Sequence, residues 1–208
     1  MSTVIAIIGA ESTGKTTLAR EVADALRADG HKVALVSEYL REFCDAHCRT
    51  PQVQEQAGIA AEQTRRIAEA AQAHDIVVAD TTALMIAVYS EQVFGDRSLY
   101  AEAQATQQSY ALTLLTALDL PWQADGLQRD GPHVREPVNA LVRASLARAA
   151  VPYSVVSGSG AARLASALAA VRHTMRSTVE GDDDGQRWHW VCDRCGDTDC
   201  ERHLLPRH

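Results

Sequence analysis

The sequence predicts an α/β fold with three layers, in which a central parallel sheet is covered by helices on both faces. Short, apolar, β-branched segments alternate along the chain with longer segments of helical periodicity. A glycine-rich turn separates the first apolar segment from the first helical one. Strands that alternate with helices at this spacing are typical of parallel sheets, because each connection must cross a face of the sheet.

The first part of the chain contains the clearest elements. Residues 4–8 form a short apolar segment that predicts a buried strand. Residues 16–28 carry apolar side chains at helical spacing, and Gly30 lies just beyond them, as expected where a helix ends. A second strand is expected at residues 32–37 and a long helix at residues 51–73.

The rest of the domain repeats this alternation. Further strands are expected at residues 76–79, 111–118 and 153–156. Further helices are expected at residues 82–92, 99–109, 138–149 and 160–175, with a polar loop at residues 121–137. We assume that other strands flank the first strand on both sides.

The composition of the chain changes near residue 180. An acidic, glycine-containing stretch is followed there by a short segment rich in Trp, Cys and His. Acidic stretches of this kind are typical of linkers. We therefore expect an α/β domain at residues 1–178, an acidic linker at 179–187 and a small Cys/His-rich tail at 188–208.

The charge of the chain limits its partners. The formal net charge is −7 at pH 7 and the pI is about 5.6. Proteins that bind duplex DNA usually present a basic field, so no nucleic-acid partner is expected.

The first apolar segment is too short for a signal peptide or a membrane span, and no basic region precedes it. We expect a cytoplasmic protein.

The segment GAESTGKT at residues 9–16 matches all four fixed positions of the phosphate-binding pattern G-x-x-x-x-G-K-[ST]. Gly9 and Gly14 permit backbone angles that let successive N–H groups surround an anion, and the next helix directs its positive end there. Lys15 supplies a cation for the phosphates and Thr16 a hydroxyl for Mg²⁺. The pattern predicts a P-loop NTPase fold that binds ATP or GTP together with Mg²⁺. The residues expected to contact the nucleotide are Gly9, Glu11, Ser12, Thr13, Gly14, Lys15, Thr16 and Thr17.

Asp80 ends the third expected strand. A carboxylate at the end of a buried strand near a P-loop is suited to orient Mg²⁺ or its water shell. The alternative is that Asp80 caps the following helix, and the two roles are compatible.

The second strand is followed by the segment SEYLREF, which combines carboxylates, aromatic rings and a cation. Ligands of open α/β sheets bind at the carboxyl ends of the strands, so this segment is expected beside the P-loop. Glu38 is expected to bind an acceptor hydroxyl or take its proton, Arg41 to hold an anionic group, and Tyr39 to stack on a ring. The alternative is the start of a solvated helix whose charged side chains face water and whose Phe43 packs in the core.

Cationic side chains occur in the polar segment after the fourth strand. Arg129, His133 and Arg135 lie there among Gly and Pro residues. This composition is typical of a lid that excludes water and brings positive charge to a transferring phosphoryl group, with Arg129 and Arg135 as the catalytic cations. The alternative is an ordinary surface loop. Ser157, after the last strand, is expected to border the nucleotide base or to belong to a flexible turn.

The cysteines form two groups. Cys192, Cys195, Cys200 and His203 offer three thiolates and one imidazole, a ligand set that suits structural Zn²⁺. The alternatives are a disordered tail with free thiols and a redox-sensitive pair. Such a tail is also a candidate site for a protein partner. The other two cysteines, Cys44 and Cys48, are expected on one helix face as small buried hydrophobic residues.

Four segments together resemble a known family. GAESTGKT, SEYLREF, VVADTT and LPWQADGLQR are similar to segments of the ribosylnicotinamide kinase domain of the NadR family and of related P-loop ATPases. The resemblance covers about residues 4–175. It implies that Lys15 and Thr16 serve the phosphates and Mg²⁺, and that Glu38 and Asp80 serve the substrate hydroxyls, the general base and the Mg²⁺ water. It further implies that the acceptor side is lined by Tyr39, Arg41 and Trp122, and that the lid contains Arg129 and Arg135.

The resemblance implies an ATP-dependent kinase that phosphorylates a nucleoside, in particular nicotinamide riboside to nicotinamide mononucleotide. In NadR this domain follows a nucleotidyltransferase domain, whereas this sequence begins at the P-loop strand, so any adenylylation is expected elsewhere. The Cys/His-rich tail also departs from the family pattern. Two alternatives remain: a regulatory ATPase that acts through a zinc-binding tail, and a kinase for another nucleoside or nucleotide.

Overall fold

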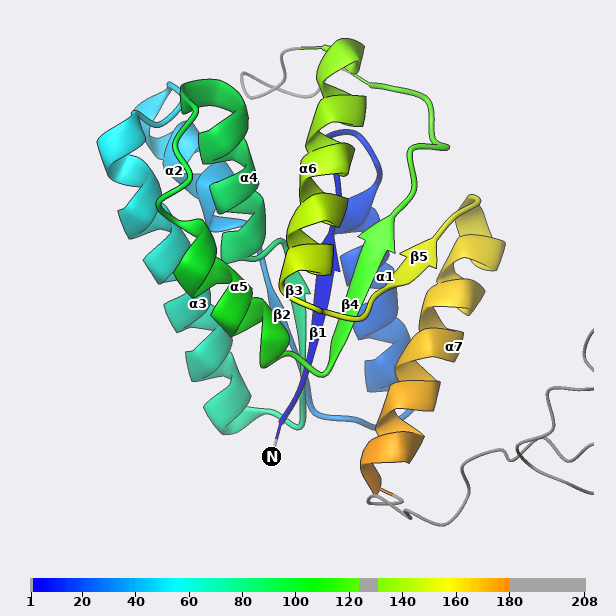
Figure 1. Cartoon of the computed structure of the whole chain (residues 1–208). Coiled ribbons are helices and arrows are strands. Elements are labelled where there is room, and N and C mark those ends of the chain that lie inside the picture. Colours follow the sequence, from blue (N-terminus) through cyan, green and yellow to red (C-terminus); the bar gives the residue numbers. More distant parts are fainter. Residues whose placement is uncertain (1, 124–130, 180–208) are drawn as a thin grey trace, which may run out of the picture. The chain divides into compact units, whose positions relative to one another are not determined.

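The computed structural model describes residues 2–123 and 131–179, and the account below concerns the compact unit Met1–Thr174 within that range. Its centre is a five-stranded sheet in the order β2-β3-β1-β4-β5, with every neighbouring pair parallel (Figure 1). The strands are β1 (Thr3–Ile8), β2 (Val33–Val36), β3 (Ile76–Asp80), β4 (Leu112–Thr116) and β5 (Ser154–Val156). The parallel sheet confirms the predicted fold class, and β3 and β4 flank β1 as assumed.

Helices cover both faces of the sheet. They are α1 (Lys15–Ala28), α2 (Tyr39–His47), α3 (Val53–Ala73), α4 (Ala83–Phe94), α5 (Tyr100–Gln108), the short 3₁₀ helix η1 (Pro132–Val134), α6 (Arg135–Arg148) and α7 (Gly160–Val179). Helices α1 and α7 lie on one face, and α3 to α6 lie on the other (Figure 1). No helix in the described part of the chain combines the length and apolar character needed to cross a membrane.

Helix α2 contains most of the segment SEYLREF, which was expected either to line an acceptor site or to begin a solvated helix. It buries Leu40 and Cys44, which are four residues apart and therefore on one face. Phe43 is half-buried and stacks on His47. The expectation that Cys48 is also buried is wrong: it follows the helix in a left-handed conformation (φ 50°), which turns the chain away, and its side chain is exposed.

The loop expected at residues 121–137 is shorter than predicted. Helix α6 begins at Arg135, three residues before the predicted start. Pro137 suggested a break, but proline is tolerated in the first turn of a helix, where its missing N–H would have no helical partner. Pro132 occupies the same kind of position in η1. Arg135 therefore belongs to a helix and not to a loop.

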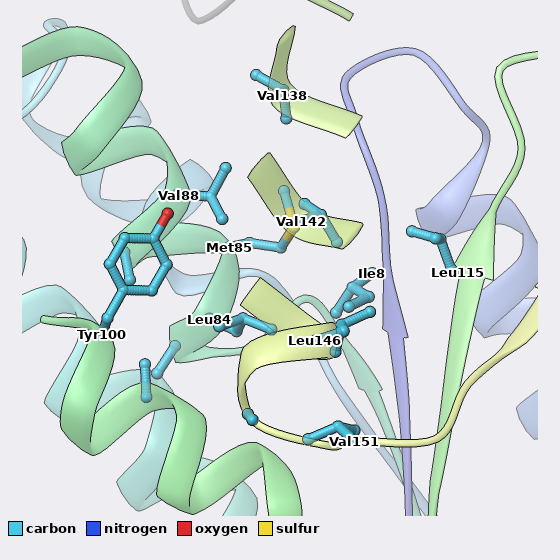
Figure 2. Packing of buried hydrophobic residues seen from close by; sticks show 14 of the residues in the cluster. Ile8, Leu84, Met85, Val88, Tyr100, Leu115, Val138, Val142, Leu146 and Val151 are labelled. Atoms are coloured by element: carbon cyan, nitrogen blue, oxygen red, sulfur yellow. The ribbon is translucent and has the colours of Figure 1, made fainter. Parts of the chain in front are cut away.

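The largest described core cluster fixes the sheet against three helices. Side chains from the ends of β1 and β4 meet the inner faces of α4, α5 and α6 (Figure 2). The labelled members are Ile8, Leu84, Met85, Val88, Tyr100, Leu115, Val138, Val142, Leu146 and Val151. The cluster is mostly aliphatic, and it packs against the sheet edge from which the P-loop departs.

Candidate functional site

Residues 9–14 connect β1 to α1 at the carboxyl edge of the sheet, and Lys15 and Thr16 are the first residues of α1. Gly9 has φ +148°, and a Cβ at this position would lie 2.1 Å from Oγ1 of Thr116 at the end of β4. Gly14 has φ +72° and is the N-cap of α1. Both glycines are therefore required by the backbone: the first by close contact with β4, the second by its left-handed turn into the helix.

Hydrogen bonds brace the loop from inside. The Thr13 and Thr116 hydroxyl oxygens lie 2.7 Å apart, and Thr13 donates to the carbonyl oxygen of Ala10 at 2.7 Å. Thr116 also donates to the carbonyl oxygen of Ile8 at 3.2 Å. The Lys15 ammonium donates across the loop to the carbonyl oxygen of Ala10 at 2.8 Å. These hydrogen bonds within the protein define the shape of the loop.

Two cavities open beside the loop. The first, which we call the phosphate-loop cavity, has a volume of about 620 Å³. The P-loop residues that line it are Ser12, Thr13, Gly14, Lys15, Thr16 and Thr17. The second, which we call the α2–α4 cavity, has a volume of about 650 Å³ and is lined mainly by α2, the start of α3 and the end of α4. Glu11 lines this second cavity.

The two cavities share one wall. Lys15, Glu38 and Arg41 line both of them. Lys15 comes from the start of α1, while Glu38 is the N-cap of α2 and Arg41 lies in its first turn. The Arg41 guanidinium Nε lies 3.8 Å from Oε2 of Glu38. The fold therefore brings together a cation, a carboxylate and a second cation where the cavities meet.

Gln63 of α3 organises this wall, although the sequence analysis did not select it. Its fully buried side chain accepts a hydrogen bond from the Tyr39 N–H at 2.7 Å. It donates to the carbonyl oxygens of Ser37 at 3.3 Å and Thr81 at 3.1 Å. Gln63 thus accepts from the first N–H of α2, and the carboxylate of the N-cap Glu38 makes no side-chain cap to the helix.

The residues proposed for Mg²⁺ fit that ion in chemical type. Asp80 ends β3 opposite Ile7 of β1, and it is buried. Its Oδ1 has no hydrogen-bond partner among the described residues. The helix-capping alternative is wrong, since the N-cap of α4 is Thr82. Thr16 lines the phosphate-loop cavity, whereas Asp80 lines neither of the two cavities. Carboxylate and hydroxyl oxygens are the ligands that Mg²⁺ prefers.

Cys44 lines the α2–α4 cavity as a neutral thiol. Burial, together with the neighbouring carboxylates of Asp45 and Glu38, raises the pKa of the Cys44 thiol to about 11. A thiol with this pKa carries little thiolate at neutral pH and is a poor nucleophile. Cys44 therefore contributes shape and apolar surface to the cavity.

Three side chains lie differently from the expected arrangement. The Tyr39 ring packs under the Arg66 guanidinium, 4.4 Å from the ring centroid, and lines neither cavity. Trp122 is half-buried, and only its neighbours on either side line the phosphate-loop cavity. Ser157 is exposed and lines neither cavity, whereas Ser159 lines the phosphate-loop cavity. These comparisons concern the phosphate-loop cavity and the α2–α4 cavity.

Arg135 also differs from a lid residue. It is buried, and Nη1 donates to the carbonyl oxygen of Leu120 at 3.0 Å. Leu120 lines the phosphate-loop cavity, but Arg135 itself lines neither of the two described cavities. Its position follows from the earlier start of α6, which places this side chain behind the wall of the cavity. Arg129 lies outside the described residues.

Arg163 is a second residue that sequence patterns did not reveal. It comes from α7, is buried and lines the phosphate-loop cavity. Its Nη2 donates to the carbonyl oxygen of Thr13, and Nη1 donates to that of Gly158 at 3.0 Å. Nη1 also lies 3.4 Å from the Asp119 carboxylate, which accepts from the Gly158 N–H. Arg163 therefore ties the P-loop to the chain segments that follow β4 and β5.

The zinc interpretation falls outside this description. Cys192, Cys195, Cys200 and His203 lie beyond residue 179, where the described part of the chain ends. Within residues 2–123 and 131–179, no group of three or more His, Cys, Asp or Glu side chains is arranged to hold a metal ion. The tail and the acidic linker remain predictions from the sequence.

The parallel sheet and the loop between β1 and α1 define a P-loop nucleotide-binding domain. A family model described as an AAA domain matches residues 4–163, so the chain belongs to this AAA domain family. No curated protein sequence matches the chain at a significant level.

Solved structures with a similar fold include two of the NadR protein. One is in complex with NR and has a TM-score of 0.67 and 20% sequence identity, covering 83% of this chain and 51% of that chain. The other is in complex with NAD and AMP-PNP and has a TM-score of 0.65 and 20% identity, covering 84% and 50%. The chain thus spans about half the length of these NadR chains. At this identity, the likeness establishes the shared fold.

Proposed function

We propose that the protein is an ATP-dependent kinase that phosphorylates a hydroxyl group of a nucleoside, with nicotinamide riboside as the acceptor. The observation that carries this proposal is the wall of Lys15, Glu38 and Arg41 between two cavities of similar size. A protein that only hydrolyses ATP needs one cavity and access for water. A kinase needs a donor site and an acceptor site that meet at the transferring group.

The proposed chemistry assigns a role to each wall residue. The acceptor hydroxyl oxygen forms a bond to the γ-phosphorus while the bond from that phosphorus to the β-phosphate oxygen breaks, which leaves ADP. The hydroxyl proton passes to the Glu38 carboxylate. Lys15 and Arg41 stabilise the negative charge on the phosphoryl oxygens. When bound with ATP, Mg²⁺ supplies further charge neutralisation, and Thr16 and Asp80 are the residues that would hold it.

Two considerations favour nicotinamide riboside among nucleosides. One similar NadR structure contains NR, the abbreviation of nicotinamide riboside, and another contains NAD and the ATP analogue AMP-PNP. The resemblance of the SEYLREF and LPWQADGLQR segments to that family agrees with this acceptor.

A direct assay tests the proposal. The purified chain is incubated with ATP, Mg²⁺ and each member of a nucleoside panel, and ADP and mononucleotide are quantified. We expect nicotinamide riboside to give ADP and nicotinamide mononucleotide in equal amounts, and Lys15→Ala to abolish this transfer. Lys32→Ala, which changes an exposed lysine outside both cavities, is the matched control. ADP release that no nucleoside accelerates would contradict the proposal and favour the regulatory ATPase.

A further inference from the structure

The α2–α4 cavity contains a buried hydrogen-bond acceptor that the described residues do not satisfy. Gln56 of α3 lines this cavity and is only 4% exposed. Its Oε1 is buried and has no hydrogen-bond partner in the described part of the protein. Almost all buried polar groups in folded proteins are paired, because an unpaired one loses its hydration without compensation. A ligand that brings a hydrogen-bond donor to Oε1 would supply the missing partner.

The same cavity has an apolar rim. Four large hydrophobic side chains are exposed among the described residues, and three of them line this cavity: Val53 (44% exposed), Val93 (59%) and Phe94 (41%). Val53 is the first residue of α3, and the other two end α4. Exposed apolar side chains that gather at one cavity are typical of binding sites. The rim is suited to the face of an aromatic ring.

The cations of this cavity do not provide a ready partner for a carboxylate on such a ring. Arg49 lines the cavity, but it already holds Glu55 through two hydrogen bonds of 2.7 Å. The other two cations that line it, Lys15 and Arg41, lie on the wall shared with the phosphate-loop cavity, where Lys15 donates to the carbonyl oxygen of Ala10 and Arg41 lies beside Glu38. A ring with an uncharged donor therefore matches the free acceptor of Gln56 and the apolar rim better than a ring with a negative charge.

We propose that Gln56 selects acceptors whose ring carries an uncharged hydrogen-bond donor over those that carry a carboxylate. This inference rests on the proposed function, within which it names the preferred substrate class. The carboxamide NH₂ of nicotinamide riboside donates to Oε1 of Gln56, and the ring packs on Val93 and Phe94. Nicotinic acid riboside differs only in having a carboxylate, which offers no donor and faces the lone pairs of Oε1.

A matched pair of ligands tests the proposal in the wild-type protein. We compare kcat/KM for nicotinamide riboside and nicotinic acid riboside and expect the amide to be preferred about tenfold or more, the effect of one hydrogen bond to a buried group. In Gln56→Leu, kcat/KM for the amide should fall about tenfold, while the value for the acid should change little. Gln92→Leu, an exposed glutamine of α4 outside both cavities, is the matched control and should retain the preference.

Calorimetric binding of the two ribosides without ATP separates failure of this inference from failure of the proposed function. If neither riboside is phosphorylated but the amide binds more tightly in a manner that depends on Gln56, the kinase proposal fails and the selectivity stands. Equal affinity for the two ribosides, a preference that survives in Gln56→Leu, or binding of neither riboside overturns the inference. Binding of AMP-PNP to Gln56→Leu verifies that the variant is folded.

Discussion

Gly9→Ala provides a sharp test of how the P-loop is anchored. The added Cβ would lie 2.1 Å from Oγ1 and 3.2 Å from the carbonyl oxygen of Thr116. Thr116 has little freedom to move, since its hydroxyl contacts Thr13 and Ile8, and its strand pairs with β1 through Ile8 and Leu115. Relief of the contact therefore requires β4 to shift or two buried hydrogen bonds to be lost.

The magnitude follows from two separable costs. Overpacking of a well-packed site typically costs about 1–3 kcal/mol. A non-glycine residue at a φ of +148° adds roughly 1–3 kcal/mol. Gly9→Ala should therefore lower the free energy of unfolding by about 2–6 kcal/mol. Equilibrium unfolding in urea, with circular dichroism as the probe, measures this change.

Substitutions of two other glycines separate the backbone cost from the packing cost. Gly30 has φ +91° with no atom within 4 Å of the added Cβ, so Gly30→Ala reports the backbone cost alone. Gly58 lies in α3 with equally open surroundings, and Gly58→Ala should stabilise by up to about 1 kcal/mol. Thr116→Ala in the Gly9→Ala background removes the 2.1 Å contact and should recover part of the loss. A Gly9→Ala effect no larger than that of Gly30→Ala would refute the reasoning.

Three further predictions concern single side chains. Lys15→Ala should retain the unfolding midpoint within a few degrees but reduce kcat by at least about 10²-fold, because the phosphoryl charge loses its cation; turnover near the wild-type rate would show that the site is elsewhere. Gln63→Met should lower the free energy of unfolding by about 2–4 kcal/mol, because the start of α2 loses its hydrogen-bond partner. The variant should also lower kcat by a larger factor than it raises KM, because Glu38 at the start of α2 loses its support. An unchanged kcat measured by steady-state kinetics would limit Gln63 to a structural role. A hydrogen bond from Arg49 lowers the pKa of Glu55 to about 2, so its stabilising contribution is present above pH 4.5 and disappears as the pH falls towards 2. The difference in urea midpoint between wild type and Glu55→Gln should therefore be larger at pH 6 than at pH 2.5, and a constant difference would exclude this linkage.

The elements near the P-loop were predictable because their signals are local. The strand at residues 3–8 is apolar because both faces of a parallel sheet are covered. Gly9 and Gly14 reveal the turn because few other residues adopt its backbone angles. Lys15 follows at a fixed spacing, and Asp80 ends a strand that is apolar throughout. Each signal lies within a few residues of the feature that it predicts.

The acceptor side was predictable only in part. The segment SEYLREF indicated charged groups near the site, and the structure places Glu38 and Arg41 on the shared wall. The ring of Tyr39 turns instead to Arg66, twenty-seven residues away in the sequence. The direction of a side chain depends on which partners surround it, and a sequence segment alone does not contain those partners. The same reason explains why Ser159 and not Ser157 lines the phosphate-loop cavity.

The sequence by itself determined that the chain forms a P-loop α/β domain, because that conclusion depends on contiguous residues and on the periodicity of single elements. Only the tertiary structure decided how the two cavities are lined. Gln56 and Gln63 are unremarkable polar residues in a long helix, and Arg163 meets Thr13 from 150 positions away. The role of a buried polar group depends on whether the atoms around it satisfy its hydrogen bonds. Those atoms are brought together by the packing of helices on the sheet.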